Sequence, residues 1–285
     1  MRCWLIALLL AGESVVMAQA PEWQRELTHV PPAGHLHVPP CEMTFELGWN
    51  DWVTAGKAAL SVRESGTYWR ADASASSTGF ARTLWRYDCE MTSVIERAGI
   101  SPHYLEHAET DREETCRYRV SFQPTRVTTE TTVAPKKGVA HTTTAVCKCG
   151  PMDDLLSVIL YVRSQALTPD QKITRVVQPW DKPYLTTFEV LGRETLEFGG
   201  KKRPCIKVAV KIRRIDRSTL ALSSYKKMKT STIWISDDAL RLPIEMHADI
   251  FVGYMSARMT GMRLLTGKEA TASLPRNMTV REASQ

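Results

Sequence analysis

The chain has 285 residues, of which 24% are charged and 43% hydrophobic, ordinary globular values that exclude wholesale disorder. Fifteen glycines and fifteen prolines exclude a collagen-like or low-complexity chain. The 37 basic and 31 acidic residues give a formal net charge of +6. This excess is too mild for a dedicated nucleic-acid binder, so nucleic acid is not an expected partner.

The N-terminus predicts a secretory signal peptide over residues 1–20. Arg2 precedes an apolar run at 4–11, and Ala18 and Ala20 form an A-x-A cleavage site. Cleavage is expected after Ala20, which would release the mature chain into the periplasm. The apolar run is too short to cross a bilayer and no later stretch is long enough, so no transmembrane segment is expected.

Removal of the signal peptide takes away one of seven cysteines and leaves an even number, which in an exported chain favours disulfides. The disulfide candidates are Cys41, Cys89, Cys116, Cys147, Cys149 and Cys205. Residues two apart in a strand have Cα atoms about 6.7 Å apart, at the limit of disulfide geometry. We therefore predict that Cys147 and Cys149 pair with different distant partners, the alternative being a metal or redox site. Because Cys-x-Cys does not match the usual zinc spacing, no metal or other cofactor is expected.

The rest of the chain divides into three parts by composition. Residues 21–41 hold two Pro-Pro pairs without periodicity and predict an extended linker. Residues 42–262 predict a single β-rich domain. Residues 263–285 are mostly polar and aperiodic, which predicts a mobile C-terminal tail.

Apolar and polar residues alternate with period two through the domain, the pattern of half-buried strands. The clearest runs are 43–50, 116–122, 206–213 and 242–252. Short turns between such runs imply antiparallel neighbours. A Thr-rich stretch at 125–144 predicts a hairpin with one solvent-exposed face, at an edge of the sheet.

One helix is predicted, with Pro151 at its first position and Asp153 and Asp154 in its first turn. Its apolar face consists of Leu155, Leu156, Ile159, Leu160 and Val162. A single apolar helix among strands must bury this face against the sheet. The expected fold is mainly β: one curved antiparallel sheet or open barrel of about ten strands packed around one α-helix.

The chain contains no nucleophile elbow, phosphate loop, dinucleotide glycine pattern or HExxH zinc motif. Asp237 and Asp238 are adjacent carboxylates, but they fall at a hairpin tip where Asp is favoured as a turn residue. His103 and His107 are expected on one face of a strand about 13 Å apart, too far to share a metal. No catalytic residue is assigned, and an enzyme is not expected.

An apolar ligand cleft is the candidate binding site. Tryptophans at strand positions and apolar helix residues could line it, although aromatic side chains at strand positions more often belong to the hydrophobic core. The candidate cleft residues are Trp49, Trp52, Leu155, Ile159 and Trp234. Basic runs at 201–203, 211–217 and 226–229 could face an anionic surface or serve as solubilising strand edges.

Several blocks together resemble the bacterial domain of unknown function 3108 family. They are residues 53–58, 153–163, 190–194, 205–208 and 232–245, within a match over roughly 42–262. The most specific block is a hairpin whose motif residues are Trp234, Asp237, Asp238, Arg241 and Pro243. The resemblance implies an exported, largely antiparallel β envelope protein, similar in fold to the open barrels of periplasmic lipoprotein and lipid carriers. It implies no catalytic residue.

Two functional hypotheses follow. The first is a non-enzymatic periplasmic protein that binds or carries a lipid-like or other apolar ligand. The alternative is a structural or assembly factor that binds an envelope protein partner through a strand edge or the basic face. The expected partners are thus a lipid or an envelope component, and no oligomeric state is predicted.

Overall fold

The computed structural model describes residues 20–35, 37–50, 52–226, 230–250, 253–275 and 278, so the predicted signal peptide lies outside the described residues except for its last one. Strands dominate the described chain. They are β1 (Cys41–Trp49), β2 (Val53–Ser65), β3 (Tyr68–Ser77), β4 (Asp88–Glu96), β5 (Ser101–Thr110), β6 (Glu114–Gln123), β7 (Arg126–Pro135), β8 (His141–Cys147), β9 (Lys172–Val177), β10 (Tyr184–Phe198), β11 (Lys201–Ile215), β12 (Leu222–Ser224), β13 (Ser231–Ser236), β14 (Pro243–Asp249) and β15 (Tyr254–Leu264). The helices are α1 (Gly79–Leu84), α2 (Leu155–Ser164) and the 3-10 helices η1 (Glu22–Glu26) and η2 (Gly267–Ala270).

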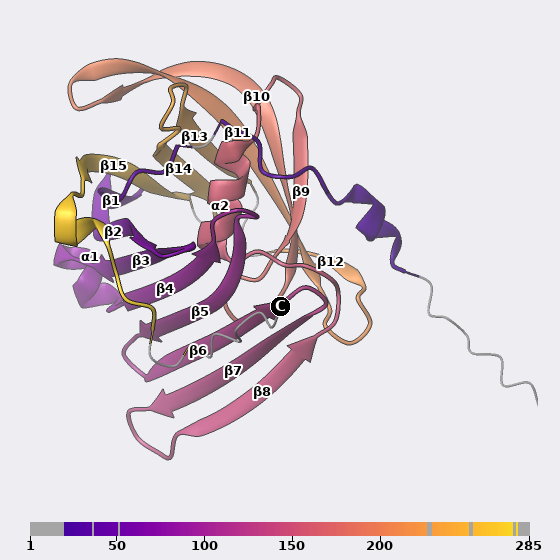
Figure 1. The fold of residues 1–285 in the computed structure, drawn as a ribbon. Helices are drawn as coiled ribbons and strands as arrows, with labels where there is room; N and C mark the ends of the chain where they lie inside the picture. Colours follow the sequence, from indigo (N-terminus) through magenta and orange to yellow (C-terminus); the bar gives the residue numbers. More distant parts are fainter. Residues whose placement is uncertain are drawn as a thin grey trace, which may run out of the picture.

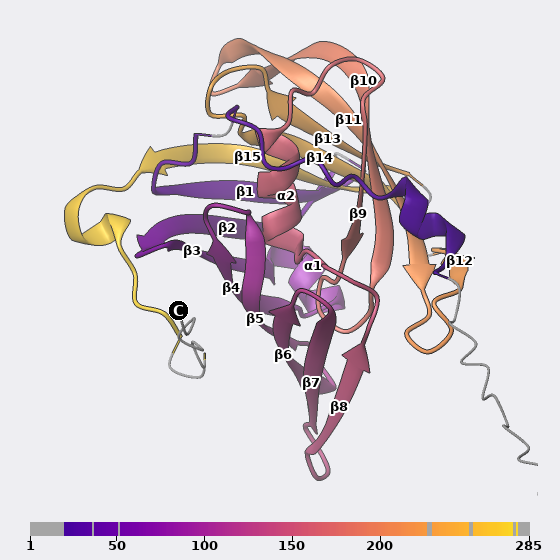
Figure 2. The ribbon, with the colours of Figure 1, turned by 45° about the vertical axis from the view of Figure 1, so that its right-hand side comes forward.

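All fifteen strands belong to one antiparallel sheet, in the order β8-β7-β6-β5-β4-β3-β2-β1-β15-β14-β13-β11-β10-β9, with β12 paired to β11. The sheet curls, and α2 stands against its concave face (Figures 1 and 2). The expected class is confirmed, but the expected count of about ten strands is wrong. Strands such as β3 consist largely of Ala and Ser, so they lack the large alternating side chains that reveal a strand in a sequence.

The sheet is open, because its end strands β8 and β9 are not paired with each other in the described chain. The segment before α2 crosses the gap instead. The Asp153 amide donates to Val176 O at 2.9 Å, and the Gln178 amide donates to Asp153 O at 2.8 Å. The Gln178 side chain then reaches Thr129 of β7 at 2.6 Å. The gap is therefore bridged by a linking segment, and the sheet stays open between β8 and β9.

Helix α2 begins at Leu155, so the prediction of Pro151 at its first position is wrong. Asp154 is the N-cap, and its side chain accepts from the amides of Leu156 and Ser157 at 2.9 and 2.7 Å. The Asp154 amide donates in return to Ser157 Oγ at 2.9 Å, which completes a capping box. These reciprocal hydrogen bonds place the N-cap three residues after the proline and the first helical residue four after it.

Apolar side chains of α2 fill the concave side of the sheet. Val158, Leu160, Tyr161 and Val162 are each at most 4% exposed and join one core cluster. The strand members of this cluster include Val62, Ala71, Ile173, Phe188, Val190, Ile206 and Val208. Burying a large aliphatic side chain contributes about 1.5–3 kcal/mol, so the helix holds strands from both halves of the sheet together.

The segment 21–41, predicted to be an extended linker, contains the 3-10 helix η1, enters β1 at Cys41 and packs against the sheet; Leu36 is outside the described residues. Trp23 is 5% exposed and donates to Leu220 O at 2.8 Å. The Thr28 amide donates to Thr174 O of β9 at 2.8 Å, and the Tyr161 hydroxyl donates to Val30 O. This segment, indigo in Figure 1, therefore covers β9 and α2.

The residues after β15, predicted to be a mobile tail, also pack against the sheet as far as they are described. The Ala272 amide donates to Glu64 O at 2.9 Å, and the Arg70 guanidinium donates to Ser273 O at 2.8 Å. Helix η2 turns the chain toward β2 for these contacts. None of the helices in the described chain combines the length and the apolar character that crossing a membrane requires.

Candidate functional site

The five predicted cleft residues lie in separate places and do not line one cleft. Trp52, in the turn after β1, is 90% exposed, and Trp49 is partly exposed at the end of that strand. Leu155 is partly exposed at the start of α2, whereas Ile159 packs against the core. Trp234 is buried in β13, where its indole donates to Glu194 Oε2 at 2.8 Å.

The motif hairpin places its carboxylates in a turn, as predicted. Asp238 Oδ1 accepts from Ser236 Oγ at 2.9 Å and from the amides of Leu240 and Arg241 at 3.0 and 3.1 Å. Asp237 instead pairs with Arg193 of β10 at 2.6 Å. Both carboxylates therefore hold the hairpin in shape, and neither faces a reacting group.

Arg241 and Pro243 complete the motif at the point where the hairpin meets α2. Arg241 has a φ of 47°, a left-handed conformation, and its guanidinium donates to the carbonyls of Arg163, Gln165 and Ala166. Pro243 is buried at the first position of β14. The most specific block of the sequence is thus a structural device that docks the β13–β14 hairpin on the end of the helix.

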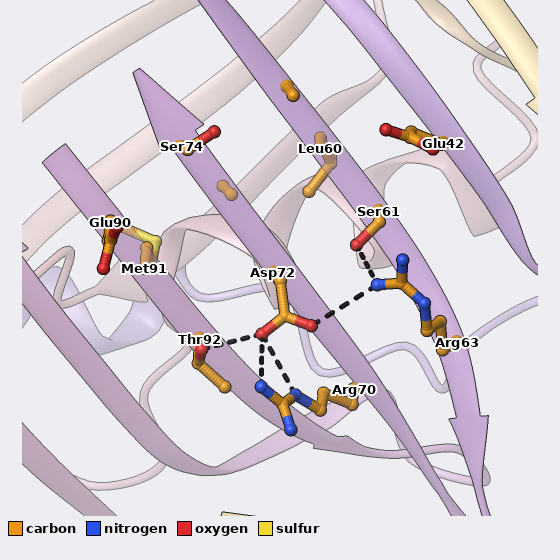
Figure 3. A pocket seen from close by; sticks show the side chains of 12 residues that line it. Glu42, Leu60, Ser61, Arg63, Arg70, Asp72, Ser74, Glu90, Met91 and Thr92 are labelled. Atoms are coloured by element: carbon orange, nitrogen blue, oxygen red, sulfur yellow. Dashed lines mark hydrogen bonds and ion pairs between the residues drawn. The ribbon is translucent and has the colours of Figure 1, made fainter. Parts of the chain in front are cut away.

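A groove of about 390 Å³ lies across β2, β3 and β4 (Figure 3). Its floor is polar, because Ser61 and Asp72 alternate along their strands with Val62 and Ala71, which belong to the core around α2. The groove therefore lies on the outer face of the sheet. Its lining includes Glu42, Arg63, Arg70, Ser74, Glu90 and Thr92.

Three charged side chains in this groove are paired, since Arg63 and Arg70 both contact Asp72. Arg70 donates two hydrogen bonds to Asp72 Oδ1 at 3.0 and 2.9 Å, and Thr92 donates to the same oxygen at 2.7 Å. Arg63 lies 3.6 Å from the other carboxylate oxygen and donates to Glu269 O at 3.1 Å. The network anchors the C-terminal segment and offers neither a nucleophile nor an apolar wall.

A polar cluster that the sequence did not predict lies on the inner face of β4, β5 and β6. Cys89 Sγ is 3.1 Å from His107 Nε2. The His107 ring stacks on Tyr118 at a centroid distance of 5.4 Å and faces Trp180 at the same distance. Tyr118 donates to Glu109 at 3.2 Å. The pairing of β4 with β5 opposes Cys89 to Glu109, so only the strand register could have revealed this cluster.

The pKa shifts of Cys89 and His107 both favour the uncharged side chain. Burial raises the pKa of Cys89 and lowers that of His107. A cysteine nucleophile needs the opposite shifts, toward thiolate and imidazolium. His103 cannot assist, because a register shift places it on the exposed side of β5 while His107 is buried; the prediction that the two histidines share a face is wrong.

The six cysteines are all free thiols in the described chain, so the predicted disulfides are not present. In particular, Cys147 and Cys149 do not reach distant partners, because their own sulfurs lie 3.3 Å apart. Strand β8 ends at Cys147 and Gly150 takes a φ of 92°. The chain therefore leaves the extended conformation on which the prediction depended.

Exposed apolar side chains lie at the start of β2 and in and just after α1, two segments that contact each other. This surface, called the α1 surface below, consists of Trp52, Val53, Phe80, Leu84 and Trp85, which are 90, 36, 73, 65 and 58% exposed. Helix α1 packs on β2, and the Thr78 amide donates to Ala55 O at 3.0 Å. Helix α1, with Phe80 and Leu84, and the C-cap Trp85 thus follow a backbone contact with Ala55, two residues from Val53.

Ion pairs hold α1 in place. Arg82 donates to both carboxylate oxygens of Asp88 at 2.8 and 2.7 Å and to Ser77 O at 3.1 Å. The hydrogen bond from Arg82 lowers the pKa of Asp88. Exposed Arg86 lies 3.8 Å from the same carboxylate, and Arg112 donates to the Thr83 carbonyl. Cationic side chains therefore border the α1 surface.

Comparison with solved structures places the fold among barrel-like proteins. The chain superposes on a beta-barrel-like protein of domain of unknown function DUF1849 from Brucella abortus with a TM-score of 0.53, at 10% identity, over 81% of this chain and 100% of that one. It is less similar to a Bacteroides fragilis protein described as exported with a YmcC-like fold, with a TM-score of 0.36, 7% identity and coverage of 80% and 97%. A Parabacteroides distasonis protein described as a lipoprotein matches with a TM-score of 0.30, 6% identity and coverage of 80% and 97%.

No curated protein matches the chain. A family model described as "Protein of unknown function (DUF3108)" matches residues 43–260, the whole sheet from β1 to most of β15, with the motif hairpin inside it. The resemblance drawn from the sequence is thereby confirmed, and the chain belongs to the DUF3108 family.

Proposed function

We propose that the protein is a non-enzymatic, periplasmic envelope protein that binds lipid through the α1 surface. The observation that carries this proposal is that two tryptophans, a phenylalanine and a leucine, all more than half exposed, lie in two segments whose backbones are neighbours, the start of β2 and the α1 region. Isolated exposed apolar residues need no explanation, but a group of them marks an interaction site. Tryptophan beside arginine suits the headgroup level of a membrane, where an apolar body and cations are both favoured.

The geometry supports this surface better than an interior cleft. Helix α2 and the core side chains occupy the concave side of the sheet. The groove of about 390 Å³ on the outer face is lined mainly by polar side chains with partners of their own. An apolar ligand is therefore better accommodated by the α1 surface than by either of these places.

Vesicle co-sedimentation of the mature chain tests the proposal. We expect binding to vesicles that contain anionic phospholipid, and a loss of that binding in the variant Trp52→Ser/Phe80→Ser/Leu84→Ser. Leu191→Ser is the matched control, since Leu191 is also an exposed apolar residue (53%) but lies in β10. Equal binding by the triple variant and the control, or no binding by the unmodified chain, would show that the α1 surface is not a lipid site.

A second candidate function is binding of a protein partner at the edge of β8. This strand ends the sheet, and β7 is its one partner among the described strands. The other edge, β9, is covered by Thr28 and by Asp153. An uncovered edge can accept a strand from another chain. The basic face is less suited, because Lys211 pairs with Glu189 at 2.7 Å and Arg213 pairs with Glu26.

Proline substitutions at two neighbouring positions test the edge. Successive backbone N–H groups of a strand point to opposite sides, so either Thr142→Pro or Thr143→Pro removes an outward donor and the other removes a bond to β7. The variant that loses less thermal stability is the one that lacks only the outward N–H group. This variant should no longer bind the envelope protein that the unmodified chain binds. Capture that survives in both variants excludes the β8 edge.

A further inference from the structure

Cys147 and Cys149 bring two sulfur atoms together in the core. Their Sγ atoms lie 3.3 Å apart, and the two residues are 2% and 3% exposed. Both belong to a hydrophobic cluster with Trp23, Val127 and Met152, at the place where β8 ends and the chain turns toward α2. A disulfide needs the sulfurs about 1.2 Å closer, a shift that a turn residue such as Lys148 can absorb.

The two thiols differ chemically. The hydrogen bond with Cys149 holds the pKa of Cys147 below its usual value, and the nearby Arg217 acts in the same direction. The same pairing raises the pKa of Cys149, as does burial. A thiolate forms first at Cys147, with Cys149 beside it as a proton donor and second thiol.

The remaining cysteines lack this arrangement. Within the described chain Cys89 contacts His107, Cys116 contacts Glu114 and Cys205 contacts Arg203 O. Burial raises the pKa of these three thiols and of Cys41. Among the contacts of the described residues, the one between two sulfur atoms is therefore that of Cys147 with Cys149.

We propose that Cys147 and Cys149 form a redox pair that closes to an intramolecular disulfide by exchange with a disulfide oxidant. The Cys147 thiolate attacks one sulfur of the oxidant, forms a mixed disulfide and expels one thiolate. Cys149 then loses its proton and attacks Cys147 Sγ, so the second half of the oxidant leaves as a thiolate. Two protein thiols are oxidised and one disulfide is reduced to two thiols, which balances atoms and electrons.

Access to the pair comes through the end of the edge strand. Since β8 has a partner on one side, its last residues can separate locally at less cost than a central strand. Trp23 of η1 closes the same cluster from the N-terminal segment, held by its hydrogen bond to Leu220 O. Loss of the Trp23 side chain should therefore speed oxidation of the pair.

The test is to reduce the mature, folded chain, remove the reductant, add oxidised glutathione, and then map thiols by mass spectrometry. We expect the free thiol count to fall by two, with a bond between Cys147 and Cys149. Cys149→Ser should trap glutathione on Cys147, whereas Cys147→Ser should acquire little at Cys149. Cys89→Ser is the matched control and should form the bond as the unmodified chain does.

Phenylarsine oxide, which bridges two close thiols, is the second probe and requires no oxidation. One arsenic should bind per reduced chain, and binding should be lost in either Cys147→Ser or Cys149→Ser but not in Cys89→Ser. Circular dichroism of each variant confirms that the sheet is folded. Two unreacted thiols at these positions in a folded chain, or disulfides from each of them to a distant cysteine, would overturn the proposal.

Discussion

Arg241 and Arg163 each bind the segment that carries the other. Arg241 donates to Arg163 O at 3.2 Å, and Arg163, 3% exposed, donates from Nη2 to Leu240 O at 2.7 Å. Burial lowers the pKa of Arg163 to about 10. The last carbonyls of a helix have no partner within it, so Arg241 supplies donors where α2 ends, while Arg163 donates in return to the β13–β14 hairpin.

Replacing Arg241 by alanine should destabilise the fold. The variant leaves the carbonyls of Arg163, Gln165 and Ala166 without their donor, a loss we expect to lower the free energy of unfolding by roughly 2 kcal/mol. Urea denaturation measures it. The control is Arg263→Ala, which removes an arginine paired at the surface with Glu42 and should cost less than about 1 kcal/mol. Equal losses for both variants would contradict a docking role for Arg241.

Asp154 should affect stability in two ways, as the N-cap of α2 and as a carboxyl group that takes up a proton in the folded chain. Asp154→Ala removes the acceptor for the Leu156 and Ser157 amides and should cost about 1–2 kcal/mol. Asp154→Asn keeps an acceptor but cannot ionise. Burial raises the pKa of Asp154, so between its unfolded and folded pKa the folded chain holds a proton that the unfolded chain has released.

The stability contributed by this proton is gained as pH falls through the raised folded pKa and is lost as pH rises. The wild-type chain should therefore become more stable relative to Asp154→Asn between pH 7 and about pH 4, the unfolded value. Chemical denaturation of both proteins across this range is the measurement. A difference that stays constant with pH would mean that Asp154 keeps an ordinary pKa in the fold.

Arg82→Gln should weaken lipid binding without unfolding the chain. Arg82 holds α1 to Asp88, so its loss frees the helix that carries Phe80 and Leu84. Vesicle affinity should fall while the unfolding midpoint in urea stays close to that of the wild type. The control is Arg97→Gln, which removes an arginine that pairs at the surface with Glu64 of β2. If Arg97→Gln weakens binding as much as Arg82→Gln, general loss of charge explains the effect and α1 positioning does not.

Sequence patterns predicted the class of the fold because burial on one side of a strand leaves a period of two. The run from Ile206 to Arg213 shows this, since Ile206, Val208 and Val210 are all buried in β11. The same logic undercounts strands whose inward residues are small, as Ala71 and Ala73 are in β3. Ala71 nevertheless joins the core cluster that contains the α2 side chains, so a small residue is buried there without marking the strand in the sequence.

The candidate site could be predicted less well, since it depends on which strands become neighbours. Trp49 and Trp234 lie on strands that pair into one sheet, yet β15 and β14 separate β1 from β13. The meeting of Cys89 with His107 depends on the register of β4 against β5. The 3.3 Å contact of Cys147 with Cys149 depends on where β8 ends, which period-two patterning does not determine.

Removing the His107 imidazole should stabilise the protein in acid. Its Nδ1 is buried without a hydrogen-bond partner in the described chain, and burial lowers the pKa of the ring. A lowered folded pKa means that stability is lost as pH falls through the unfolded value of about 6.5, because the unfolded chain takes up the proton more readily. His107→Phe retains the stacking on Tyr118 and Trp180 and has no proton to gain.

His107→Phe should therefore unfold at the same or slightly higher urea concentration than the wild type at pH 7.5, and at a clearly higher one at pH 5. His107→Ala, which leaves a cavity between the two rings, should cost about 2–4 kcal/mol at pH 7.5 and less at pH 5, where the wild type has itself lost stability through His107. A catalytic imidazolium paired with a Cys89 thiolate would behave in the opposite way, since the folded chain would then hold the proton. A wild-type protein that gains stability over His107→Phe in acid would return the Cys89–His107 pair to consideration as an active site.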